Sequence, residues 1–134
     1  NGNYEDISNG GFDLIDSNCP IRPDGYYGIS KALGESIGRY YSEVHGLSVL
    51  CLRIGTVRTD DTPQDVRQLA TFLFQKDLVN LILKCIDAPE DLRFGIYYGV
   101  SNNKWRFWDI ENSSKELGYS PQCDAEVFRN KLSR

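Results

Sequence analysis

Tyr27 and Lys31 are the residues of this sequence whose types and spacing are best suited to chemistry. Residues four apart in a helix share one face. A tyrosine has an ordinary pKa near 10 and is a poor base at neutral pH, but a nearby ammonium favours the phenolate. Such a pair can remove a proton from an alcohol while hydride leaves the same carbon. Because this spacing is common, an interfacial tyrosine beside a solvated lysine is the alternative interpretation.

A helix over residues 26–45, ended by Gly46, must position this pair. Apolar residues recur along it at helical spacing and form one stripe: Ile29, Leu33, Ile37, Tyr40, Tyr41 and Val44. A second stripe consists of the small residues Ser30, Gly34, Gly38 and Ser42. Each interior glycine costs about 1 kcal/mol relative to alanine. We therefore expect a strand, helix or ligand to approach this second stripe closely.

The remaining segments alternate between helix and strand. After an irregular stretch over 1–24, the sequence predicts a strand over 47–54, a loop over 55–65, a helix over 77–88, a strand over 95–100, a helix over 109–117 and a short helix within 124–132. This alternation predicts an α/β fold built on a parallel sheet. Two strands make a poor sheet, so we expect further strands upstream of Asn1.

Composition narrows the class of protein. A chain of 134 residues suits one domain, and its net charge of -4 argues against a nucleic-acid partner. No run of about 18 apolar residues indicates a membrane span, and no signal peptide is apparent. The four cysteines are widely spaced and only one histidine is present, which disfavours a structural metal or a disulfide framework. These features favour a cytoplasmic protein.

Several motifs together resemble a known family. The stretch Pro23-Asp24-Gly25-Tyr26-Tyr27-Gly28-Ile29-Ser30-Lys31, followed by an apolar helix and then Leu52-Arg53-Ile54-Gly55, is similar to the extended short-chain dehydrogenase/reductase family, also described as NAD-dependent epimerases/dehydratases. Within that family the sequence most resembles uronate dehydrogenases and related sugar dehydrogenases. The resemblance covers roughly residues 20–128 and implies the C-terminal part of a Rossmann-type parallel sheet with a small substrate-binding region.

The resemblance implies roles around the cofactor. Tyr27 would be the proton acceptor, and Lys31 would tune it and bind the nicotinamide ribose. Ile54 and Val57 would border the nicotinamide. The expected cofactor is NAD, and NADP remains open because the residue that selects between them would lie upstream.

The resemblance also implies substrate contacts. Thr56 would contact sugar hydroxyls, and Arg67 would bind a substrate carboxylate through its planar guanidinium. The alternatives are a loop cap for Thr56 and a solvated helix residue for Arg67. Arg58 is a rival anion ligand on the same loop, whereas Arg53 is expected to be structural.

Two family features are missing from the sequence. It contains no glycine-rich dinucleotide-binding turn, and the family's catalytic serine would lie just before residue 1 if Gly2 is the glycine that follows it. We therefore expect residues 1–134 to be the C-terminal portion of a single NAD(P)-binding Rossmann-type domain. We also expect the chain alone to be catalytically inactive.

Three functions follow from these observations. The first is oxidation of a sugar or hexuronic acid at its anomeric carbon, with NAD as the acceptor. The second is a nucleotide-sugar epimerase or dehydratase, which would use the same Tyr27 and Lys31. The third is a non-catalytic module that senses dinucleotides or binds partners. The apolar stripe of the 26–45 helix could form a homodimer, although we slightly favour its packing on the chain's own sheet.

Overall fold

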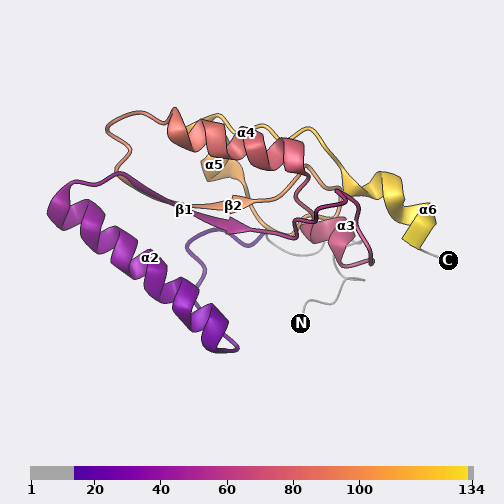
Figure 1. Ribbon diagram of the computed structural model, residues 1–134, viewed down its shortest axis with the longest axis horizontal. Coiled ribbons are helices and arrows are strands. Elements are labelled where there is room, and N and C mark those ends of the chain that lie inside the picture. Colours follow the sequence, from indigo (N-terminus) through magenta and orange to yellow (C-terminus); the bar gives the residue numbers. More distant parts are fainter. Residues whose placement is uncertain (1–13, 133–134) are drawn as a thin grey trace.

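Two parallel strands form the sheet of this protein: β1 (Val49–Ile54) and β2 (Phe94–Gly99). Their register runs from the Val49–Phe94 pair to the Ile54–Gly99 pair. The structure is a computed structural model that describes residues 14–132. Helix α2 lies on one side of the sheet and α4 on the other (Figure 1). The predicted α/β class with a parallel sheet is therefore confirmed.

Helix α2 (Tyr26–His45) has the predicted bounds. Gly46 ends it in the left-handed conformation at φ 71°, and its N–H donates to the Ser42 carbonyl oxygen at 3.0 Å. A residue with a Cβ would be strained at that φ, so the glycine gives the chain its turn into β1.

The small-residue stripe of α2 approaches the sheet at its C-terminal half only. A Cβ built on Gly38 would lie 2.8 Å from Val49 Cγ1, and the buried Ser42 hydroxyl donates to the Arg93 carbonyl oxygen at 2.9 Å. Nothing lies within 4 Å of a Cβ built on Gly34. The predicted close approach is thus confirmed at Gly38 and Ser42 and wrong at Gly34 for the residues described.

The apolar stripe of α2 does not pack on the sheet. Its six members, Ile29, Leu33, Ile37, Tyr40, Tyr41 and Val44, are 46–59% exposed. The favoured expectation, packing on the chain's own sheet, is wrong within residues 14–132. The physical reason is that the glycine face allows the helix backbone to sit against β1, which rotates the larger side chains away from it.

The other helices surround the far side and the ends of the sheet. They are α3 (Gln68–Thr71), α4 (Gln75–Ile86), α5 (Glu111–Leu117), the 3-10 helix η1 (Ala125–Phe128) and α6 (Arg129–Leu132). Strand β1 begins two residues later than predicted and α4 two residues earlier. Helix α3 was not predicted. None of the described helices is long and apolar enough to cross a membrane.

Two apolar clusters hold these elements together. The larger contains Leu81, Tyr97, Tyr98, Val100, Ile110, Leu117 and Tyr119 and joins α4, β2 and α5. The smaller contains Leu69, Phe72, Phe74 and Ala125 and joins α3 to the C-terminal tail. The smaller cluster lies beside the segment that follows β1, because Phe72 pairs with Thr56 in an isolated parallel bridge, so it supports the loop expected to face substrate. Gly2, named above in connection with a catalytic serine, lies outside the described residues.

Candidate functional site

The first two turns of α2 bring the phenol of Tyr27 and the ammonium of Lys31 together. Lys31 Nζ lies 5.2 Å from the centroid of the Tyr27 ring, so the two side chains share a face as their spacing predicts. Tyr27 is 76% exposed, and its backbone carbonyl oxygen accepts from Ser30 Oγ at 2.7 Å. The phenol is therefore open to a ligand and not buried in an apolar contact. The catalytic roles of both residues stay predictions.

The carboxyl end of β1 presents two exposed apolar side chains. Ile54 is 52% exposed and Val57 is 38% exposed. In α/β proteins with parallel strands, ligands bind outside the carboxyl ends of the strands. These two residues are thus available at the edge of the sheet where a flat apolar ring could be bound.

Thr56 is held by the last residue of α3, Thr71. Its Oγ1 lies 3.0 Å from Thr71 Oγ1, and its N–H donates to the Thr71 carbonyl oxygen at 2.8 Å. A Cβ on Gly55 would come within 2.1 Å of that same carbonyl oxygen, so only glycine permits the approach. Thr71 could not be predicted as a site residue, because fifteen residues separate it from Thr56 and no local pattern signals the contact.

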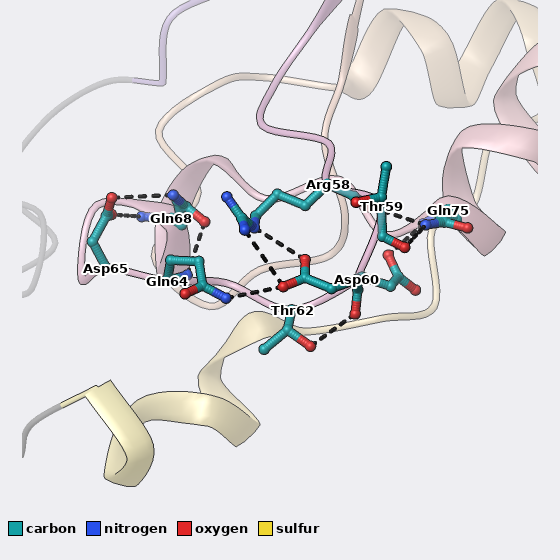
Figure 2. Close-up of polar contacts among 9 residues, drawn as sticks. Arg58, Thr59, Asp60, Thr62, Gln64, Asp65, Gln68 and Gln75 are labelled. Atoms are coloured by element: carbon teal, nitrogen blue, oxygen red, sulfur yellow. Dashed lines mark hydrogen bonds and ion pairs between the residues drawn. The ribbon is translucent and has the colours of Figure 1, made fainter.

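The loop after β1 is braced by polar side chains, as Figure 2 shows. Arg58 Nε pairs with Asp60 Oδ1 at 3.0 Å, and this guanidinium holds the pKa of the Asp60 carboxyl below its usual range. Gln64 donates to the other Asp60 oxygen at 3.1 Å. Gln75 of α4 donates to the Arg58 carbonyl oxygen at 2.9 Å. Arg58, the rival anion ligand, is therefore already neutralised by its own loop.

Arg67 differs from Arg58 in this respect. Arg67 is exposed and directly precedes α3. Asp65 fixes the start of that helix, because its carboxylate accepts hydrogen bonds from Gln68 N at 2.9 Å and from Gln68 Nε2 at 3.1 Å. Within residues 14–132, no hydrogen bond or ion pair engages the Arg67 guanidinium. Of the two arginines on this loop, Arg67 is thus the one whose fork is free for an anionic ligand.

Arg53 joins β1 to α2. Its Nε and Nη2 donate to the two carboxylate oxygens of Glu35 at 2.7 and 2.8 Å, and this pairing raises the pKa of the Arg53 guanidinium. The guanidinium also lies over the ring of Tyr98, 5.6 Å from its centroid, and that ring stacks on Trp108. The expectation that Arg53 is structural agrees with these contacts.

The chain is similar in sequence to known sugar dehydrogenases. No family model matches the chain. It is 38% identical over 120 residues to a uronate dehydrogenase of Pseudomonas syringae pv. tomato, covering 90% of this chain and 42% of the relative. It is 60% identical over 113 residues to an L-arabinose 1-dehydrogenase (NAD(P)(+)) of Haloferax volcanii, covering 77% of this chain and 44% of the relative.

Solved structures show the same likeness. The crystal structure of uronate dehydrogenase from Agrobacterium tumefaciens has a TM-score of 0.83 to this protein at 33% identity, covering 90% of this chain and 44% of that one. A mutant of that enzyme complexed with NAD also has a TM-score of 0.83, at 32% identity. The chain spans less than half the length of the relatives it matches.

Proposed function

We propose, because the chain is homologous to uronate dehydrogenases and related sugar dehydrogenases over about 90% of its length, that it contributes the substrate-facing part of an NAD-dependent sugar dehydrogenase. The reaction would be oxidation of a hexuronate or similar sugar at its anomeric carbon. Residues 1–134 would form the C-terminal portion of a single NAD(P)-binding Rossmann-type domain. The observation that carries the proposal is the exposed Tyr27 phenol with the Lys31 ammonium beside it.

The described residues suit one end of a dinucleotide. The phenol and ammonium are hydrogen-bonding groups suited to ribose hydroxyls, and the exposed Ile54 and Val57 are suited to the flat nicotinamide ring. The sequence has no glycine-rich turn to hold a pyrophosphate. When bound, NAD would supply the hydride acceptor. Tyr27 would take the proton from the sugar hydroxyl, and Lys31 would favour the phenolate that takes it.

Thr56 and Arg67 would orient the sugar. The Thr56 hydroxyl is fixed by Thr71 and can still exchange a hydrogen bond with a substrate hydroxyl, since a threonine oxygen both donates and accepts. The free guanidinium of Arg67 matches a carboxylate bidentately. A hexuronate carries both kinds of group, which is why we favour it as the substrate.

The test is NADH formation by the protein expressed from its complete coding sequence, with glucuronate as substrate. Tyr27→Phe removes the proton acceptor, and we expect kcat to fall by about 10²–10⁴-fold. Tyr26→Phe is the matched control, because Tyr26 is the neighbouring tyrosine of α2 and is 92% exposed. Equal activity of the two variants would contradict the assignment of Tyr27.

A neutral aldose is the second candidate substrate, because identity to the L-arabinose 1-dehydrogenase reaches 60%. Arg67→Gln separates the two. Loss of a charged hydrogen bond of about 1.5–3 kcal/mol should raise KM for glucuronate by about 10–100-fold and leave KM for L-arabinose unchanged. Arg58→Gln is the control, since Asp60 already pairs with that side chain. If only arabinose is oxidised, and Arg67→Gln has no effect, the carboxylate role is wrong.

Assembly and location belong to the same proposal. The exposed apolar stripe of α2, defined above, would form a homodimer with the same stripe of a second copy. Four free cysteines support a cytoplasmic location.

The purified 134-residue chain, given NAD and glucuronate, should form no NADH. Interconversion of a nucleotide sugar without net NADH would instead support an epimerase, and dinucleotide binding without any turnover would support the non-catalytic module.

A further inference from the structure

Glu35 lies one helical turn after Lys31 on α2, so its carboxylate and the Lys31 ammonium share one face of the helix. Helical side chains lean toward the N-terminus of their helix, and the default direction of Glu35 is therefore toward Lys31. In the structure, both oxygens of Glu35 are occupied by Arg53 of β1, at 2.7 and 2.8 Å. The Lys31 ammonium instead lies 5.2 Å from the centroid of the Tyr27 ring.

The Glu35–Arg53 pair is protected from solvent. The Glu35 side chain is 14% exposed and the Arg53 side chain 22%. Arg53 Nη1 also donates to the Ser17 carbonyl oxygen at 3.3 Å and to Tyr98 Oη of β2 at 3.4 Å, which fixes the guanidinium from a turn before α2 and from the second strand. The other titratable group near Glu35 on β1 is Cys51, whose thiol pKa is raised by burial and by the Glu35 charge.

We propose that Arg53 is a positioning residue: by holding both carboxylate oxygens of Glu35, it keeps the Lys31 ammonium available to the Tyr27 phenol. The inference rests on the proposed function, in which Tyr27 takes a proton with the help of Lys31. Two cations of α2, Lys31 and Arg39, lie one turn from Glu35. Arg39 already pairs with Glu43 at 3.0 Å and lies 4.3 Å from the centroid of the Phe94 ring, so without Arg53 the Lys31 ammonium is the cation left to approach the shielded carboxylate.

The proposal predicts that the two halves of the ion pair are not equivalent. Arg53→Met leaves a Glu35 carboxylate that captures Lys31, so the phenol loses its ammonium. Glu35→Gln removes the competing charge and leaves Lys31 with Tyr27. A pair that only stabilises the fold would instead give similar defects from either substitution, because the same contact is lost both ways.

The experiment measures kcat and KM in four forms of the protein expressed from its complete coding sequence: wild type, Arg53→Met, Glu35→Gln and the double variant. We expect kcat to fall at least about tenfold in Arg53→Met, because a displaced ammonium weakens a proton transfer that is itself worth about 10²–10⁴-fold. Glu35→Gln and the double variant should stay within about threefold of wild type, because neither keeps a carboxylate that competes for Lys31. The double variant thus rescues the single one. KM for the sugar should change little throughout.

A spectroscopic measurement without cofactor or substrate reports the same event. The tyrosinate absorbance of each form, less that of its Tyr27→Phe counterpart, follows the Tyr27 phenolate alone. We expect this absorbance to require a higher pH in Arg53→Met than in wild type, and to be unchanged in Glu35→Gln and the double variant. If Arg53→Met does not fold, Arg53→Lys replaces it, since lysine cannot hold both oxygens in a fork.

Two failures are distinguishable. A wild-type protein that oxidises no sugar would overturn the proposed function, while the tyrosinate titration would still test the Lys31 contact. An active wild type in which Arg53→Met and Glu35→Gln are equally slow, with no recovery in the double variant, would overturn the positioning role of Arg53.

Discussion

Asp77 is a buried carboxylate whose replacement should measure how strongly α4 is tied to the C-terminal tail. It is 2% exposed and lies in the first turn of α4. Oδ2 accepts from Ser101 Oγ at 2.6 Å and from Cys123 N at 3.1 Å, and Oδ1 accepts from Gln122 N at 2.9 Å. Three donors from two other segments thus depend on one side chain.

The expected loss follows from these three contacts. A buried donor left without a partner costs about 1–3 kcal/mol. Asp77→Ala strands three donors, and because neighbouring losses do not add fully we expect the free energy of unfolding to fall by about 3–5 kcal/mol. In Asp77→Asn the amide nitrogen must face one of the donors, so we expect about 1–3 kcal/mol.

Urea unfolding followed by circular dichroism measures both losses, in the protein expressed from its complete coding sequence. Asp87→Asn is the matched control, since Asp87 is an exposed residue at the other end of α4, and its loss should stay within about 0.5 kcal/mol. The slope with urea concentration should not change. An Asp77→Asn midpoint equal to that of Asp87→Asn would show that the three hydrogen bonds of the buried carboxylate contribute nothing to stability.

Two further predictions concern α2 and the cysteines. Gly34→Ala should stabilise the purified chain by up to about 1 kcal/mol, since nothing lies within 4 Å of a Cβ at that position. Gly38→Ala should be less stable than Gly34→Ala by about 1–3 kcal/mol, because its Cβ meets Val49. Thermal unfolding of both variants checks this order. Cys19 is exposed, whereas burial raises the pKa of the Cys85 thiol. Alkylation mapped by mass spectrometry should therefore modify Cys19 first and Cys85 only as the pH rises. Equal alkylation rates at the two cysteines would contradict this.

Local patterns determined the elements of this protein. Helix α2 could be predicted to the residue, because its stop is a glycine that takes the left-handed conformation. Gly118 ends α5 in the same way, at φ 68°. The shared face of Tyr27 and Lys31 also followed from spacing alone, since helix geometry fixes which residues are neighbours.

Errors at element ends came from contacts distant in sequence. Helix α4 begins at Gln75, two residues before the predicted start, although its N-cap residue Phe74 has no capping side chain. The cap comes from Asp61, whose carboxylate accepts from Gln75 N at 2.9 Å across fourteen residues. No start signal stands next to the helix in the sequence, so a local pattern could not place it.

Only the tertiary structure decided which side chains the elements bring together. The choice of face on α2 depended on Val49, which packs on Gly38, and the partner of Arg53 proved to be Glu35, eighteen residues earlier. Periodicity shows that a face exists, but the packing of separate elements selects the one that is buried. Sequence alone therefore determined the two strands, the helices other than α3 and the Tyr27–Lys31 pair, whereas long-range packing and hydrogen bonding determined how the pair and its loop are held.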